Sequence, residues 1–139
     1  MTDPDTEERI ETTDDEPPMR PVGPSLSRGW LGRCPACGEG DIFSAYLKVR
    51  DNCPHCGEEL FHQRADDAPP YMTIFVVAHV IVPLMIVYER VAHPPLWHHM
   101  TIGIGLTIAL SLVLLPRIKG ALIGIQWAKY MHGFGGRYD

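Results

Sequence analysis

The chain has 139 residues, of which 45% are hydrophobic and 21% are charged, so it is long enough for one domain with short additions and too short for several. Its formal net charge of −5 is concentrated at the N-terminus, where residues 1–20 carry eight acidic side chains and two arginines. The remainder is nearly neutral and lacks a strongly basic face, which argues against nucleic-acid binding. The acidic start also lacks the apolar core of a signal peptide, so we expect a cytoplasmic N-terminus.

Residues 1–27 are rich in Thr, Asp, Glu and Pro and contain few apolar side chains. Such a segment buries too little surface to offset the entropy lost on ordering, so it is predicted to be a disordered tail. The same composition favours a solubilising role over a docking motif.

All four cysteines lie in two copies of one short pattern, CPACG at residues 34–38 and CPHCG at residues 53–57. Two Cys-x-x-Cys pairs can supply the four thiolates of tetrahedral zinc, and cytoplasmic thiols stay reduced. A structural zinc site is therefore predicted at Cys34, Cys37, Cys53 and Cys56. The same knuckles also suit the iron of a rubredoxin-like electron carrier, whereas a thiol-redox role is less favoured.

Short apolar segments predict strands at residues 42–43, 46–49 and 60–61. With the two knuckles they predict a small zinc ribbon over residues 28–62, whose core depends on its metal. A closed shell of four thiolates leaves no position for a substrate, and the sequence contains no nucleophile with a matching base. We therefore predict that the protein is not an enzyme.

Residues 63–116 are predicted to form a helical hairpin that crosses a membrane, with spans at about 71–88 and 97–116. Each segment is nearly free of charge and approaches the roughly 20 residues that a bilayer core requires. Basic residues outnumber those of the connecting loop on the outer sides of the hairpin, so both termini are expected in the cytoplasm. Two buried helices of a soluble protein are the less favoured alternative, because little else in the chain could cover them.

Residues 117–139 mix apolar side chains with Lys119 and Lys129. This mixture predicts a C-terminal interfacial helix that lies along the cytoplasmic surface of the membrane. Continuation of the second span as a kinked helix is the alternative.

Several motifs resemble the bacterial domain-of-unknown-function family 983. They are the two Cys-Pro-x-Cys-Gly repeats, the segment HQRADDAPPY at residues 62–71, His79 with Pro83, Gln126-Trp127 and the segment MHGF at residues 131–134. The resemblance implies a small bacterial inner-membrane protein with an N-terminal zinc ribbon and two transmembrane helices, of unestablished function. It also implies a link to the assembly of haem-copper cytochrome oxidases, through neighbouring genes.

Four polar residues just before the first span are candidate functional residues: His62, Arg64, Asp66 and Asp67. The aspartates could cap the first membrane helix, since carboxylates accept the free N–H groups at a helix start. Alternatively, they could form a polar cluster with His62 at the membrane surface that binds a metal or a basic partner.

His79 falls near the middle of the first span, where an ionisable residue is a candidate functional site. Gly103, Thr107 and Ser111 recur every four residues in the second span and share one face of it. We therefore predict that this face packs on the first helix and that His79 bonds to Thr107 or Ser111.

The leading hypothesis for function is a membrane-anchored zinc-ribbon interaction or assembly module that joins a larger membrane complex and is linked to cytochrome oxidase biogenesis. The first alternative is an intramembrane metal-handling or haem-handling protein that uses His79 with loop histidines such as His98 and His99. The second alternative is the rubredoxin-like electron carrier.

Overall fold

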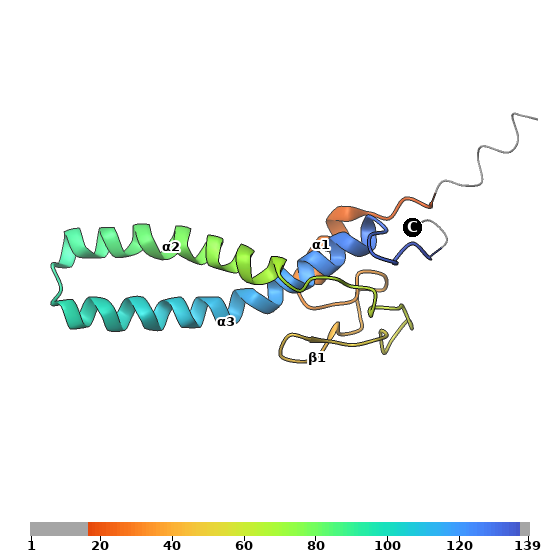
Figure 1. Ribbon diagram of the computed structural model, residues 1–139, viewed down its shortest axis with the longest axis horizontal. Coiled ribbons are helices and arrows are strands. Elements are labelled where there is room, and N and C mark those ends of the chain that lie inside the picture. Colours follow the sequence, from red (N-terminus) through yellow and green to blue (C-terminus); the bar gives the residue numbers. More distant parts are fainter. Residues whose placement is uncertain (1–16, 137–139) are drawn as a thin grey trace, which may run out of the picture.

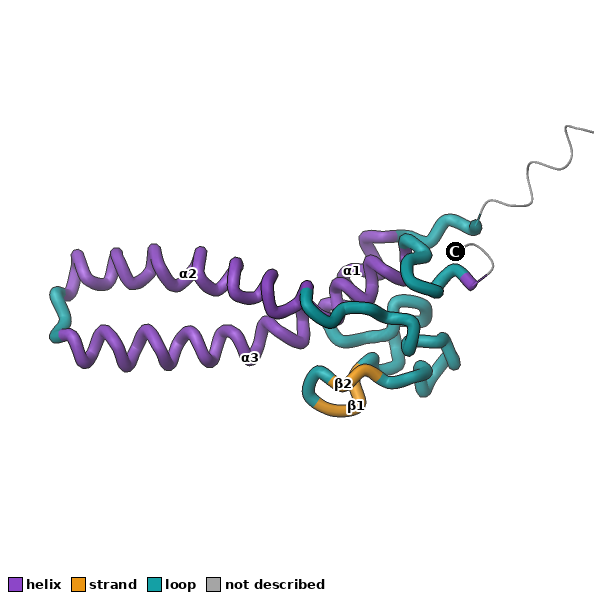
Figure 2. Tube along the Cα trace, in the orientation of Figure 1, coloured by secondary structure: helices purple, strands orange, loops and turns teal. Residues whose placement is uncertain are grey.

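The computed structural model describes residues 17–136, so most of the predicted disordered tail lies outside the described residues. The elements in this range are α1 (Val22–Trp30), β1 (Phe43–Ala45), β2 (Lys48–Val49), α2 (Ala68–Ala92) and α3 (Leu96–Ala128). The helices α2 and α3 form a long hairpin, and the other elements gather at the end opposite its turn, here called the ribbon end (Figure 1, Figure 2). This architecture is the predicted zinc ribbon followed by a helical hairpin.

Both hairpin helices are long and apolar enough to cross a membrane, since α2 has 25 residues and α3 has 33. At about 1.5 Å per residue, α2 alone measures about 37 Å, which exceeds the roughly 30 Å of a hydrocarbon core. Most side chains along the two spans are exposed, unlike those of core helices in a soluble domain. The helices meet at Gly103, where a Cβ would lie 3.4 Å from the sulfur of Met85.

The helix α3 continues through Pro116, so the prediction of a separate interfacial helix over residues 117–139 is wrong. Proline has no N–H, and Pro116 therefore leaves the carbonyl of Leu112, four residues earlier, without its helical donor. The hydroxyl of Tyr46 replaces that donor and bonds to the Leu112 carbonyl at 2.8 Å. Beyond the proline, buried side chains such as Ile123 pack into the core of the ribbon, which explains why the helix continues there.

Helix α1 corrects the prediction that disorder extends to residue 27, because residues 22–27 are helical. The helix docks on α3 through its backbone, with Gly29 against Gly120 and Ser25 against Gly124. Glycines at such a contact let two helices approach more closely than larger side chains would allow. Order in this segment thus comes from a tertiary contact that its composition does not reveal.

The ribbon contains one antiparallel pair, β1 with β2, which corresponds to the first two predicted strands with shifted bounds. The third predicted strand, at residues 60–61, does not form, and the nearest pairing is an isolated bridge between Asn52 and Glu59. Leu60 instead serves the core, where it is fully buried. The ribbon and α3 share this core, which consists of Cys34, Ile42, Cys53, Leu60, Ala65, Ile123, Trp127, Ala128 and Phe134.

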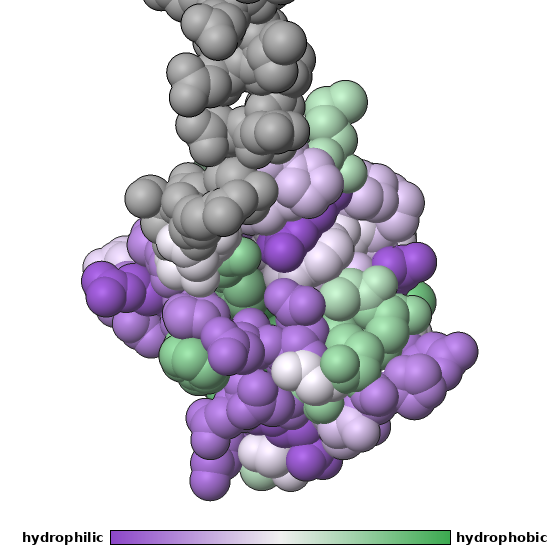
Figure 3. Space-filling view, turned by 90° about the vertical axis from the view of Figure 1, so that its right-hand side faces the viewer, coloured by the Kyte–Doolittle hydropathy of each residue, from purple (hydrophilic) through white to green (hydrophobic). Residues whose placement is uncertain are grey.

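The two ends of the molecule differ in polarity. Viewed from the ribbon end, the surface is mostly hydrophilic with separate apolar patches (Figure 3). The hairpin exposes apolar side chains along most of its length. Such a division matches a molecule with one end in water and the other in an apolar medium.

Candidate metal centre and its surroundings

Each cysteine pair lies in a tight turn that a glycine closes. The amide of Gly38 donates to the carbonyl of Cys34 at 2.8 Å, and the amide of Gly57 donates to the carbonyl of Cys53 at 3.0 Å. The two glycines have φ angles of 76° and 77°, in the left-handed region that glycine adopts without strain. The two sequence copies are therefore also copies in backbone geometry.

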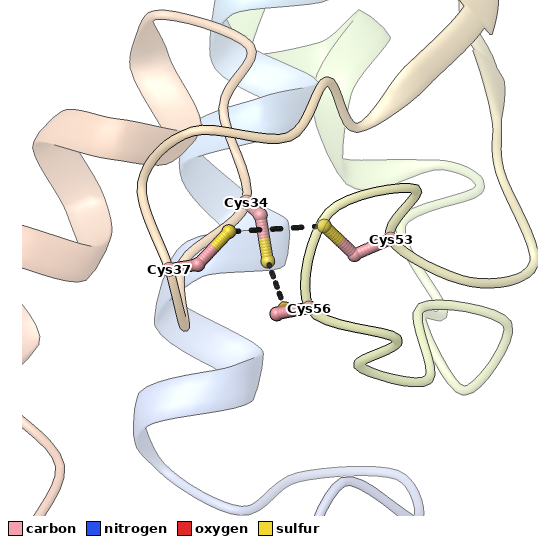
Figure 4. A group of neighbouring side chains, drawn as sticks. All are labelled: Cys34, Cys37, Cys53 and Cys56. Carbon is pink, nitrogen blue, oxygen red and sulfur yellow. Dashed lines mark hydrogen bonds between the residues drawn. The ribbon is translucent and has the colours of Figure 1, made fainter.

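The four sulfur atoms face a common centre, two from each turn (Figure 4). The sulfur of Cys34 lies 3.7 Å from that of Cys56, and the sulfur of Cys37 lies 3.8 Å from that of Cys53. All four lie within 4.8 Å of one another. Thiolates bound tetrahedrally at a Zn–S distance of about 2.3 Å are about 3.8 Å apart, whereas a disulfide needs about 2.05 Å. The spacing is that of a metal shell, so the four cysteines could hold one metal ion.

The thiols differ in their readiness to ionise. Burial raises the pKa of the Cys34 thiol, and burial also raises the pKa of the Cys56 thiol. Desolvation also raises the pKa of the Cys37 thiol. The backbone amides of Gly40 and Glu39, each 3.5 Å from its sulfur, outweigh this effect and lower the pKa to about 6. Amides aimed at sulfur stabilise the thiolate, which is the form that binds a metal.

Charged side chains join the two turns to each other and to α1. His55 Nε2 lies 2.7 Å from Glu39 Oε2 and so links the second turn to the first. From α1, the Arg28 guanidinium donates to the carbonyls of Pro35 and Ala36 at 3.0 and 3.1 Å. The N-terminal helix therefore braces the first cysteine turn.

Two side chains near the end of α3 fasten the ribbon, and sequence analysis did not predict their roles. Gln126 exchanges two hydrogen bonds of 3.1 Å with the backbone of Arg64. Trp127 Nε1 donates to the Glu58 carboxylate at 2.9 Å. Gln126-Trp127 is one of the motifs that resemble the family. Its partners, Arg64 and Glu58, lie more than sixty positions away, so no local sequence pattern identifies them.

The candidate residues before the first span do not converge on one site. His62 pairs with Glu59 at 2.9 Å, while Asp66 and Asp67 are exposed. The proposed cap is wrong for Asp67, which precedes α2 but makes no side-chain cap bond. A cap reaches the N–H groups of the second and third helical residues, and both of those residues are prolines. The backbone of Arg64 bonds to the Gln126 side chain, whereas the Arg64 side chain is exposed.

The prediction that His79 bonds to Thr107 or Ser111 is wrong. Its Nδ1 donates to the Phe75 carbonyl one turn earlier at 2.8 Å, and the two rings lie 4.1 Å apart on the exposed side of α2. Thr107 likewise bonds within its own helix, to the Gly103 carbonyl at 2.7 Å. Side chains that reach the preceding turn satisfy their polar groups without a partner helix. The predicted packing of Gly103 against α2 is confirmed.

The histidines expected in the loop, His98 and His99, lie instead in the first turn of α3, where they contact residues at the end of α2. His98 Nδ1 lies 2.9 Å from the Tyr88 hydroxyl, and His99 Nδ1 lies 3.5 Å from Glu89 Oε2. His93 ends α2 with a left-handed φ of 43°. These contacts join the two helices at the turn. In the described part of the chain, the four cysteines are the only group of side chains close enough together to bind a metal ion.

A family model for a protein of unknown function, DUF983, matches residues 43–127. The chain belongs to the DUF983 family. The matched segment contains the second cysteine turn, all of α2 and nearly all of α3, and it begins after the first cysteine turn. Comparisons with curated proteins and with solved structures found no match.

Proposed function

We propose that this DUF983 protein is a membrane-anchored zinc-ribbon module that presents an interaction surface at the cytoplasmic face of a bacterial inner membrane. In this proposal the two helices span the bilayer and pack against a larger membrane complex. The exposed apolar hairpin, the hydrophilic ribbon end and the four converging thiols support it.

The observation that carries the proposal is the attachment of the ribbon to α3. Tyr46 bonds to the Leu112 carbonyl, and the Lys119 ammonium donates to the Leu47 carbonyl at 2.9 Å. Tyr46 and Leu47 form the turn between β1 and β2, in the segment that connects the two cysteine turns. A metal site mounted in this way keeps a fixed orientation to the membrane helices, which suits a scaffold that docks a partner.

A scaffold role also follows from the chemistry of the ligand set. Four thiolates complete the tetrahedron that zinc prefers and leave no place for water or substrate. Zinc bound there would contribute folding energy to a ribbon whose own core is small. We therefore propose that the metal is structural and that the protein is not an enzyme.

The proposed orientation rests on charge. The N-terminal helix and the end of α3 both lie at the ribbon end of the hairpin (Figure 1). The basic residues near the spans at that end are Arg50, Arg64, Arg117, Lys119 and Lys129. The turn end of the hairpin has Arg90 alone, in the last turn of α2, so the positive-inside tendency favours a cytoplasmic ribbon end.

The histidine arrangement argues against the haem-handling alternative. Tyr88 bonds to His98 and lies nine residues beyond His79, which corresponds to about 13 Å along α2. His79 and His98 are therefore too far apart to ligate one metal ion.

Purified protein with one zinc and no visible absorbance would support the proposal, whereas an iron spectrum would favour the rubredoxin-like alternative.

Isolation of the tagged protein from native membranes in mild detergent tests the partner. A membrane complex that is recovered with the wild type and lost with Cys53→Ser, while the hairpin remains inserted, would support binding through the ribbon. Recovery that does not depend on Cys53 would contradict it. The link to cytochrome oxidase biogenesis is the most specific form of this proposal, and oxidase subunits in the recovered complex would support it.

A further inference from the structure

Helix α1 has its small residues inside and its large apolar residues outside. Ser25 and Gly29 are buried against α3, whereas Leu26 and Trp30 are each 38% exposed and Val22 is 37% exposed. These three apolar residues are four positions apart and so lie along one side of the helix. A helix on a water-soluble domain shows the opposite arrangement, while helices in lipid pack through small residues and expose large ones.

The outward side of α1 opens into an apolar groove of about 440 Å³. This groove is lined by residues of all three helices, among them Leu26 and Trp30 of α1, Met72 at the start of α2, and Leu122 and Ile125 of α3. The groove therefore continues the exposed apolar surface of the hairpin onto α1.

The depth of this groove follows from the hairpin. Gly103 of α3 lies against Met85 of α2. Toward the ribbon end, Met72 lies thirteen residues from Met85 and Pro116 lies thirteen residues from Gly103. Met72 and Pro116 are therefore at the same height along the hairpin. With Glu89 outside the far edge of the hydrocarbon core, the roughly 20 residues of the span extend back to Pro69. Met72 and Pro116 then lie within about one turn of the cytoplasmic edge.

A basic residue lies next to the groove at that depth. Trp30 also lines a smaller cavity of about 250 Å³ together with Pro116 and Arg117. Arg117 is exposed, and within residues 17–136 no hydrogen bond or ion pair engages its guanidinium. A tryptophan beside an unpaired arginine is typical of the headgroup region, where the ring tolerates both media and the guanidinium binds phosphate.

We infer that α1 is the interfacial helix of this protein, that Trp30 at its C-terminal end contacts the acyl chains at the edge of the cytoplasmic leaflet with Leu26 in the adjoining headgroup region, and that Arg117 binds the phosphate of an anionic phospholipid. This inference rests on the proposed function only in requiring that the hairpin spans a bilayer. Lipid is the occupant that the geometry favours, because the groove joins the membrane-facing surface at headgroup depth and has a free cation at its edge.

Quenching of tryptophan fluorescence by brominated lipid tests the inference on the full-length, zinc-loaded protein in vesicles of phosphatidylcholine and phosphatidylglycerol. The difference in emission between the wild type and Trp30→Phe isolates Trp30, and the other two tryptophans stay in place. We expect this difference signal to be quenched, and more strongly when phosphatidylglycerol carries the bromine. Arg117→Gln should lower that preference about fivefold and leave quenching by phosphatidylcholine in place.

Leu106→Trp provides the matched control, because Leu106 lies exposed in the middle of the α3 span. If residue 106 is quenched and Trp30 is not, the inference is overturned, the hairpin still spans the bilayer, and the side of α1 is left for a protein partner. If neither is quenched, the hairpin is not inserted and the proposed function fails as well. An unchanged lipid preference in Arg117→Gln would overturn the assignment of the phosphate site.

Discussion

The hydroxyl of Tyr46 is the most direct test of how the ribbon is held on the hairpin. It donates to the Leu112 carbonyl at 2.8 Å, and Pro116 deprives that carbonyl of its helical donor. Tyr46→Phe keeps the ring and removes the donor, which leaves the carbonyl without a partner in apolar surroundings. An unsatisfied acceptor of this kind costs about 1–3 kcal/mol, which corresponds to a roughly 5- to 150-fold larger open population of the ribbon turn.

Pro116→Ala completes a double-mutant cycle, because alanine restores an N–H at that position. In this background the Leu112 carbonyl regains a helical donor, so Tyr46→Phe no longer leaves an unsatisfied acceptor and should cost clearly less than it does beside Pro116. Amide hydrogen exchange of residues 43–49 in detergent micelles measures the opening. Tyr71→Phe is the matched control, since Tyr71 is exposed at the same end. Equal effects of Tyr46→Phe in both backgrounds would refute the reasoning.

Three further predictions concern the metal, the docking of α1 and pH. Cys53→Ser should lose its zinc and unfold the ribbon while the hairpin stays inserted, because zinc supplies of order 10 kcal/mol to such small domains; unchanged protease resistance would contradict this. Gly120→Ala should weaken the docking of α1 by about 1–3 kcal/mol, because its methyl group meets the α1 backbone. Proteolysis within α1 should detect this loosening but no effect of Gly105→Ala, which meets nothing within 4 Å. Zinc affinity should fall as pH falls, because burial raises the pKa of Cys34 and Cys56 and both thiols must lose protons to bind metal. A competition titration with a chelator that gave the same affinity at neutral and mildly acidic pH would argue against this.

Features that depend on local pattern could be predicted from the sequence. The two cysteine turns repeat a five-residue pattern whose proline and glycine fix the backbone, so the turns form wherever the chain places them. The two long apolar helices are equally local, because their length and uniform apolarity can be read directly along the sequence. The packing of Gly103 against α2 could be predicted because small residues recur every four positions on one face of α3.

Features that depend on contacts across the chain could not be predicted in this way. The order of α1 comes from Gly120 and Gly124, about a hundred residues away, and residues 22–27 alone suggest a disordered tail. The continuation of α3 through Pro116 depends on a donor from the ribbon, whereas proline taken alone predicts a break. His79 was misassigned because its position in a span suggests a cross-helix bond, while the carbonyl one turn earlier on its own helix was closer.

The prolines within the two hairpin helices show how the cysteine cluster and the hairpin depend on each other. Pro83 and Pro116 each remove an N–H, and so leave the carbonyls of His79 and Leu112 without their helical donors. The Leu112 carbonyl obtains a donor from Tyr46, in a turn held between the two cysteine pairs. An acceptor left unpaired in apolar surroundings is costly, so a metal that closed the ribbon around Tyr46 would also stabilise α3 at Leu112. Because a coupling free energy is reciprocal, α3 would strengthen metal binding to the ribbon by the same amount.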